Sequence, residues 1–281
     1  MKRVPGRILT AAAAFFLAAA GAFPQTGADR GRLEFTVILT PASGRPEPAR
    51  ALTIFLLRKS FRDIQHEEEG KTPQPKLDAF IEPMPVSKEL KDWMKKHQTV
   101  TISGPEFRRV LTSDELFQVP EFLDAYVASN LSGLNQGFPE PKFNPGDRTN
   151  NPKKYEAAMK TYLPLLRRYL AAHPDSPDGM DTILNQIDAT PAWQIERGHW
   201  HERVYQNALA AAQTRYLAAK TDTSLDGRGA FEAAPGSYAL STLENEALSG
   251  NLRLHWDVPV EIRAGAVTRI ELTNLNAERK P

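Results

Sequence analysis

Residues 252–263 read LRLHWDVPVEIR, and apolar and polar side chains alternate along this stretch without a break. Such alternation is typical of a β-strand with one buried face, because successive side chains point to opposite sides of a strand. We therefore expect the buried face to carry Leu252, Leu254, Trp256, Val258, Val260 and Ile262. After a turn at 264–265, residues 267–273 resume the alternation and predict the return strand of a hairpin.

Further β-type segments lie on both sides of a long helical stretch. Residues 33–40 alternate, residues 51–58 form a β-prone run, and residues 230–232 and 237–243 each follow a turn sequence containing glycine. Between residues 60 and 220, residues 66–85 predict a polar crossing. Helices are then expected at 88–97, 114–130, 152–172, 178–187 and 191–219, capped or started by Ser87, Ser113, Pro152 and Thr190.

The two β segments, 31–61 and 219–277, count 31 and 59 residues and together reach 90. Neither segment suits an independent domain, whereas 90 residues suit a sandwich of about seven strands. The sequence therefore predicts an α+β protein, in which a discontinuous β-sandwich is interrupted by a helical insertion at 62–218.

The N-terminus has the features of a secretory signal peptide. Lys2, Arg3 and Arg7 precede an apolar run of 13 residues at 8–20, and small residues at 20–22 form a cleavage site. The alternative is a single membrane anchor, but a span needs about 20 apolar residues. We expect residues 1–22 to be removed, and the mature chain to be periplasmic or extracellular without a membrane span.

Charge and cysteine content exclude several classes of function. Loss of three positive charges changes the formal net charge from +1 to −2, which argues against nucleic acid as a partner. The chain contains no cysteine, so disulfides and thiol nucleophiles are excluded. An exported chain of this kind must be held together by its core.

The β segments resemble a known family. The stretches GRLEFTV at 31–37, GRP at 44–46, ALTIFL at 51–56, DG at 226–227, PGSY at 235–238 and VPVEIRAG at 258–265 are similar to carboxypeptidase regulatory-like domains. Those domains belong with the transthyretin-like and collagen-adhesin B-type (Cna-B-type) sandwiches. The resemblance implies a Greek-key sandwich that acts as a non-catalytic accessory or scaffolding module in exported proteins, and it does not extend to the insertion.

Two sequence patterns suggest metal ligands, and each also has a simpler structural explanation. Asp222, Ser224 and Asp226, followed by Gly227, match the first half of an EF-hand-type calcium loop, but position 12 is Ala233. A polar β-turn is the simpler interpretation.

Glu196 and His199 have the Glu-x-x-His spacing that places both side chains on one helix face of a di-metal site. Such a site needs a second copy and two further carboxylates, and no second copy exists in the sequence. A solvated helix face is the simpler interpretation, and the motif by itself implies no bound cofactor.

Trp193, Trp200 and Tyr205 lie on the longest expected helix and are candidates to line a groove for a glycan or a peptide. At helical spacing such residues more often belong to a core, which is the simpler interpretation. Serine-elbow and phosphate-loop motifs are absent from the sequence. We therefore expect an exported binding or scaffolding protein whose partner is a protein or glycan of the cell envelope. The alternative is a metal-assisted hydrolase that uses Glu196 and His199.

Overall fold

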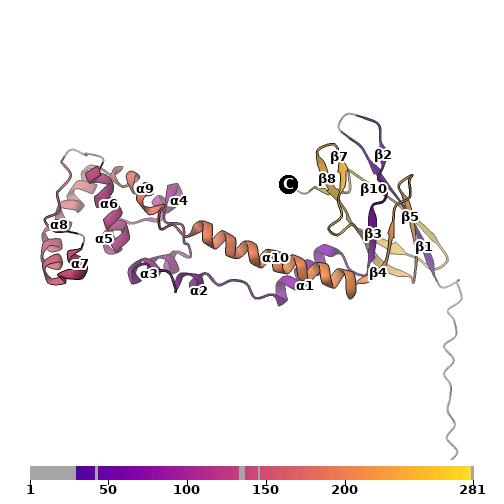
Figure 1. Ribbon diagram of the computed structural model, residues 1–281, viewed down its shortest axis with the longest axis horizontal. Helices are drawn as coiled ribbons and strands as arrows, with labels where there is room; N and C mark the ends of the chain where they lie inside the picture. The colour runs from indigo at the N-terminus through magenta and orange to yellow at the C-terminus, as the bar shows by residue number, and fades with distance from the viewer. Residues whose placement is uncertain (1–29, 42–43, 133–136, 145, 280–281) are drawn as a thin grey trace, which may run out of the picture. The chain divides into compact units, whose positions relative to one another are not determined.

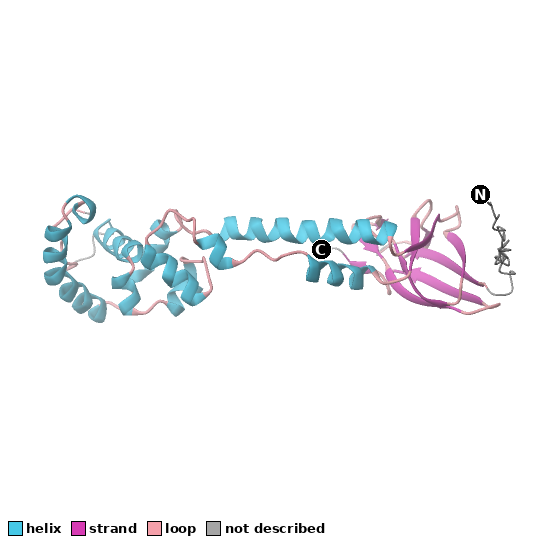
Figure 2. Cartoon of the chain, turned by 90° about the horizontal axis from the view of Figure 1, so that it is seen from below, coloured by secondary structure: helices cyan, strands magenta, loops and turns pink. Residues whose placement is uncertain are grey.

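The computed structural model describes residues 30–41, 44–132, 137–144 and 146–279. The expected signal peptide therefore lies outside the described residues. The protein is mixed α+β, with 46% helix and 23% strand, as the sequence predicted at this coarse level. The chain divides into two compact units, Met1–Arg62 with Ala212–Pro281 and Asp63–Ala211. We call them the β unit and the helical unit; their elements are shown in Figures 1 and 2.

Strand β1 (Gly31–Leu39) is the centre of the first sheet of the β unit. It pairs in parallel with β10 (Val267–Thr273), and antiparallel with β5 (Arg228–Ala233) and with the short β2 (Glu47–Pro48). Alternate residues of β1 are buried, as predicted: Leu33, Phe35, Val37 and Leu39. Their intervening neighbours therefore form the outer face of this sheet.

The second sheet has the order β4-β3-β6-β9, and all its pairs are antiparallel. Its strands are β4 (Leu217–Asp222), β3 (Thr53–Leu57), β6 (Gly236–Ser241) and β9 (Asp257–Ile262). A small third sheet joins β7 (Ala247–Ser249), β8 (Leu252–His255) and β11 (Glu278–Arg279). All three sheets contribute to one apolar core, whose fully enclosed members include Leu33, Ile54, Leu56, Leu240, Leu254 and Trp256.

The strand and hairpin predicted for residues 252–273 are wrong in their pairing. The strand is broken at Trp256, so that β8 pairs with β7 while β9 pairs with β6. Strand β10 pairs with β1 rather than with β9, and Leu252, expected inside, is exposed. The alternation continues across the break because both segments face the same core, and alternation carries no information about the pairing partner.

The helices of the chain follow the predicted boundaries in several places. They are α1 (Phe61–Lys71), α2 (Leu77–Ile81), α3 (Lys88–His97), α4 (Gly104–Val110), α5 (Ser113–Gln118), α6 (Pro120–Ser132), α7 (Asp147–Asn150), α8 (Pro152–Ala172), the 3-10 helix η2 (Ser176–Met180), α9 (Asp181–Leu184) and α10 (Thr190–Thr214). Ser87 caps α3 by accepting a hydrogen bond from the N–H of Leu90 at 3.0 Å. Pro152 begins α8, as predicted.

Three helical predictions need correction. Thr112, rather than Ser113, caps α5, and the single helix expected at 114–130 is divided into α5 and α6, with Pro120 at the start of α6. The polar crossing expected at 66–85 contains part of α1 and all of α2. The buried apolar side chains of α1 are Phe61 and Ile64, too few to show a helical period in sequence.

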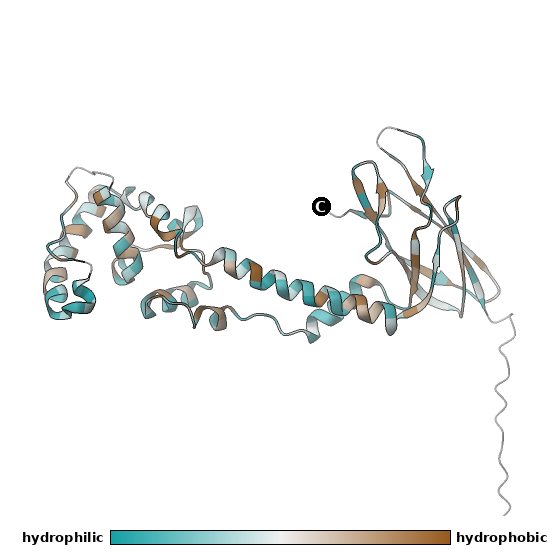
Figure 3. Cartoon of the chain, in the orientation of Figure 1, coloured by the Kyte–Doolittle hydropathy of each residue, from teal (hydrophilic) through white to brown (hydrophobic). Residues whose placement is uncertain are grey.

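The long helix α10 ends at Thr214, five residues before the predicted end. Its hydrophobic and hydrophilic positions are interleaved along its length (Figure 3). Residues 217–219, which read as helix because of their alanines, belong to β4, where Ala219 pairs with Leu56 of β3. Tertiary pairing therefore overrides the local preference for helix.

The core of the helical unit is rich in aromatic side chains. Trp93 contacts the rings of Phe107 and Phe122 edge-on, with centroids 5.6 and 5.1 Å apart. Glu115, only 8% exposed, lies beside this core. Its carboxylate accepts hydrogen bonds from Lys96 Nζ at 2.7 Å and Thr112 N at 3.1 Å, and its Oε1 lies 2.8 Å from His97 Nε2. Glu115 thus connects α3 to the start of α5.

We predict that Trp256→Ala lowers the free energy of unfolding by about 3 to 5 kcal/mol, because it leaves a cavity in the core. The indole is fully buried, and its Nε1 donates to the carbonyl of Thr273 at 3.0 Å. Denaturant unfolding measures the loss. Trp256→Phe, which keeps most of the ring volume, should lose clearly less; equal losses would contradict the cavity explanation.

We also predict a pH-dependent defect for Glu115→Gln. Burial alone would raise the pKa of Glu115, but the hydrogen bonds from Lys96, His97 and Thr112 outweigh it and hold the pKa far below 4.5. The ionised carboxylate therefore stabilises the fold above pH 4.5, and this contribution is lost as the pH falls below that value. At pH 7 the variant should lose about 2 to 3 kcal/mol.

The difference between Glu115→Gln and the wild type should shrink progressively below pH 4.5. Urea unfolding at several pH values measures it, with Glu89→Gln, an exposed carboxylate of α3, as the matched control. If the loss of stability in Glu115→Gln does not change with pH, the shape of the side chain rather than its charge explains that loss.

Candidate functional site

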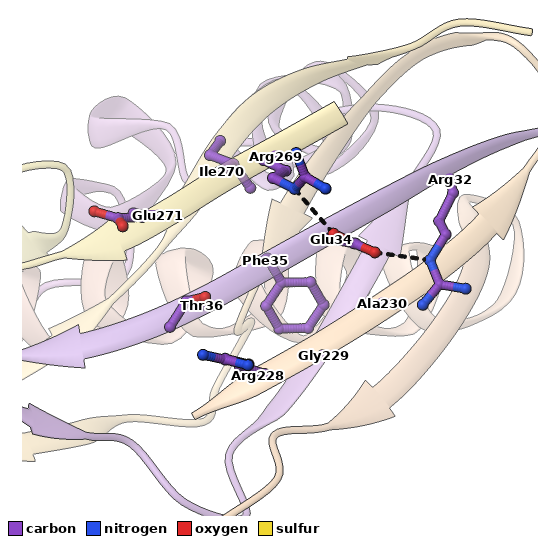
Figure 4. Close-up of a pocket in the computed structure, with 10 residues that line it drawn as sticks. All are labelled: Arg32, Glu34, Phe35, Thr36, Arg228, Gly229, Ala230, Arg269, Ile270 and Glu271. Atoms are coloured by element: carbon purple, nitrogen blue, oxygen red, sulfur yellow. Dashed lines mark hydrogen bonds and ion pairs between the residues drawn. The ribbon is translucent and has the colours of Figure 1, made fainter. Parts of the chain in front are cut away.

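A pocket of about 630 Å³ lies on the outer face of the first sheet (Figure 4). We call it the arginine pocket; its charged lining residues come from β1, β5 and β10 and are Arg32, Glu34, Arg228, Arg269 and Glu271. The strand register explains why they meet. Ala230, Glu34 and Arg269 lie side by side across the three strands, as do Arg228, Thr36 and Glu271 in the next row.

Glu34 organises two of the three arginines. Its Oε1 accepts a hydrogen bond from Nε of Arg32 at 3.0 Å, and its Oε2 accepts one from Nε of Arg269 at 3.1 Å. The hydrogen bond from Arg269 is the main reason that the pKa of Glu34 is lowered, so this carboxylate is ionised at neutral pH. The third arginine, Arg228, has its Nε 3.2 Å from Oδ2 of Asp226.

Gly229 makes room for the Phe35 ring on the core side of the sheet, opposite the arginine pocket. Gly229 pairs with Phe35 across β1 and β5, and a Cβ atom at position 229 would lie 2.2 Å from Cζ of the Phe35 ring. Because glycine has no side chain, the ring can lie against its backbone. Ala230, opposite Glu34 on the outer face, is the small residue in the lining of the pocket.

Sequence reasoning did not find the arginine pocket. The available signal was the outward half of the alternation in β1 and β10, which places Arg32, Glu34 and Arg269 on solvent faces. Pairing β1 with both β5 and β10 is what brings the three arginines together, and that pairing is not readable from local sequence patterns.

A second pocket, of about 510 Å³, lies within the helical unit. We call it the aromatic groove; α2 and its flanking loops supply most of its lining, and the start of α10 supplies the rest: Pro75, Lys76, Ala79, Phe80, Pro83, Met84, Trp193 and Glu196. The rings of Phe80 and Trp193 have centroids 5.1 Å apart and are tilted by 54°. Trp193 is half-buried, so its ring is accessible from the groove.

The three aromatic residues predicted to bind a ligand differ in their surroundings. Trp193 lines the aromatic groove. Trp200 is buried, and its Nε1 donates to the carbonyl of Thr72 at 3.1 Å, so it has a structural role. Tyr205 is half-buried further along α10 and does not line this groove. The structure therefore does not bring the three together in one binding surface.

The predicted metal ligands Glu196 and His199 are on α10. Glu196 borders the aromatic groove, and His199 is exposed. Across the part of the chain that the structure describes, no group of three or more histidine, aspartate or glutamate side chains could hold a metal ion. The hydrolase alternative needs further ligands around Glu196 and His199, and the described residues do not supply them.

The calcium-loop candidates form a closed turn. Ser224 Oγ lies 2.5 Å from Oδ1 of Asp226 and accepts a hydrogen bond from the N–H of Arg228 at 3.0 Å. Asp222 Oδ1 accepts from Thr53 Oγ1 at 2.6 Å. Gly227 has a φ of +74°, which glycine adopts readily. The oxygens of this loop are thus engaged in turn and strand contacts rather than converging on an empty centre.

A partly buried polar cluster at the start of α1 joins His255 of β8, Asp257 of β9 and Glu278 of β11. Asp257 Oδ2 accepts a hydrogen bond from the N–H of Arg62 at 3.1 Å, in the first turn of α1. Burial raises the pKa of Asp257. Its Oδ1 and the Nδ1 of His255 are buried without a hydrogen-bond partner among the described residues. Nε2 of His255 lies 3.2 Å from Glu278, which also pairs with Arg62.

Comparisons with known protein families, curated proteins and solved structures find no match for this chain. Within residues 30–279, apart from the short gaps, no helix combines the length and the apolar character that a membrane crossing requires.

Proposed function

We propose that this chain is an exported, non-catalytic binding protein of the cell envelope, with the β unit as scaffold and the helical unit as the part that contacts the partner. We further propose that the β unit is a Greek-key sandwich of the transthyretin-like kind, related to carboxypeptidase regulatory-like domains. The comparisons leave this relationship open, so the proposal rests on the residues and on the strand arrangement.

The strand arrangement supports the proposed sandwich. Consecutive strands change sheet repeatedly: β3 and β4 lie in the second sheet, β5 in the first, β6 and β9 in the second, and β10 in the first. Eight strands belong to the two larger sheets, and apart from the two-residue β2 they are β1, β3, β4, β5, β6, β9 and β10. A Greek key differs from a simple meander in having such connections.

The aromatic groove is the feature of the structure that most directly supports a binding function. Ligand sites in proteins are concave and mostly apolar, with a few polar groups that orient the ligand. This groove has two aromatic rings, two prolines, Ala79 and Met84, and its charged groups are Lys76 and Glu196. A sugar ring would need more hydrogen-bonding side chains than these, so an apolar segment of a peptide is the better match.

Peptide binding should depend on Trp193. We expect peptides selected by phage display on the purified chain to bind the Trp193→Ala variant at least about tenfold more weakly than the wild type. The reason is that a central aromatic side chain supplies much of the binding energy in such interfaces. Fluorescence polarisation measures the affinities. The matched control is Ile195→Ala, which removes an exposed apolar side chain from the same helix outside the groove.

Unchanged affinity for Trp193→Ala would place the peptide elsewhere and contradict the proposed site. If no peptide is selected but a glycan array shows binding that depends on Trp193, the ligand of the groove is a glycan rather than a peptide. Failure of both screens would contradict the binding function of the groove. Thermal unfolding of each variant verifies that the folded protein is being compared.

Export predicts a specific N-terminus. When the full chain is expressed with its own first 22 residues, intact mass spectrometry of the exported protein should give the mass of residues 23–281, because signal peptidase cleaves after small residues. Retention of residues 1–22 in a membrane fraction would support the anchor instead. An uncleaved chain that stays in the cytoplasm would contradict export.

A further inference from the structure

We propose that the arginine pocket binds a small ligand that carries oxyanion groups, either carboxylates or phosphates. This site is in the β unit and is separate from the aromatic groove, so it does not rest on the function proposed above. The argument starts from the way in which the three guanidinium groups are already occupied.

Each of the three arginines contacts a carboxylate of the chain through Nε, which leaves its terminal amino groups directed elsewhere. Nε of Arg32 and Nε of Arg269 donate to Glu34, and Nε of Arg228 lies 3.2 Å from Asp226. Nη1 of Arg32 lies 3.9 Å from Oε1 of Glu232, beyond hydrogen-bond distance. For Arg228 and Arg269, no terminal nitrogen has a hydrogen-bond partner among the described residues.

An arginine side chain has five N–H donors in a planar fork that matches carboxylate and phosphate oxygens. Glu34 restrains Arg32 and Arg269 from the middle of the pocket, and this restraint lowers the entropy that they would lose on binding. The pocket thus holds pre-oriented donors, arranged around the small side chain of Ala230.

Most carboxylates around the arginine pocket are already in contact with an arginine. The lining holds three arginines and two glutamates, while Asp226 and Glu232 beside it contact Arg228 and Arg32 and bring the local net charge to −1. One of the glutamates, Glu34, already contacts two arginines. The other, Glu271, points away from this cluster in Figure 4. An oxyanion placed over Ala230 would therefore meet the guanidinium groups before it met an unscreened carboxylate.

The ion pairs of the arginine pocket are highly exposed, so their contribution to stability alone does not explain why three arginines are gathered here. The side chains of Arg32, Arg228 and Arg269 are 51, 73 and 76% exposed, and exposed ion pairs contribute little to folding. Substitutions here should leave the fold intact, which makes binding measurements straightforward to interpret.

Isothermal titration of the purified chain with citrate, and separately with pyrophosphate, tests the site at constant ionic strength. We expect saturable binding of at least one of them. Arg269→Gln should weaken it at least about tenfold, because a charge-assisted hydrogen-bonded pair is lost. The matched control is Arg253→Gln, which removes an exposed arginine of β8 that lies outside the pocket. Glu271→Gln should leave binding unchanged or strengthen it.

The two probes distinguish the two sources of oxyanion. Binding of citrate alone assigns a carboxylate ligand, and binding of pyrophosphate alone assigns a phosphate ligand. Saturable shifts of the arginine Nε–H resonances of Arg32 and Arg269 in NMR spectra would locate either probe in the pocket. Absence of saturable binding by both probes would overturn the proposal, as would equal weakening by Arg269→Gln and Arg253→Gln.

Discussion

The burial of Trp256 is the constraint on which the β unit depends. Its backbone N–H donates to Thr242 Oγ1, its carbonyl accepts from the N–H of Thr242, and its indole N–H reaches Thr273. One residue thus connects the end of β6, the break between β8 and β9, and the end of β10. Because the indole is enclosed by the common core, the chain can change sheets at this point while the backbone N–H and C=O of Trp256 both stay paired.

The sequence predicted which side of each strand faces inward better than it predicted which strands pair. In β1 the alternation identified the buried residues, since burial follows from side-chain direction alone. Pairing depends on register with distant segments, so the parallel contact of β1 with β10 was not predictable. Helix α1 was missed because the period of 3.6 residues needs more than Phe61 and Ile64 to be recognised. The boundaries proposed for the sandwich and its insertion remain predictions.

The two pockets differ in how far the sequence could predict them. Trp193 was recognisable as a large aromatic residue on a long helix, although its partner Phe80 lies in a stretch that showed no helical pattern. The arginine pocket assembles residues 32, 228 and 269, which are far apart in the chain. Charged residues are common on the solvent-facing sides of strands. It is the register between the paired strands that brings these three arginines together. A site assembled in this way follows from how the strands pair and cannot be recognised from a local sequence motif.

Leu57 of β3 pairs with Leu217 of β4, across the whole helical insertion. Closing a flexible loop costs about 0.6 kcal/mol for each doubling of its length, so a 160-residue connection costs roughly 2.4 kcal/mol more than a ten-residue one unless the insertion has already folded. Helical contacts are local and form quickly, whereas β1 and β3 have to wait for partners made much later in synthesis. During that interval their edges are unpaired, and unpaired strand edges invite association with other chains. We therefore expect assembly to run from the middle of the chain outwards, with β1 and β3 completed last.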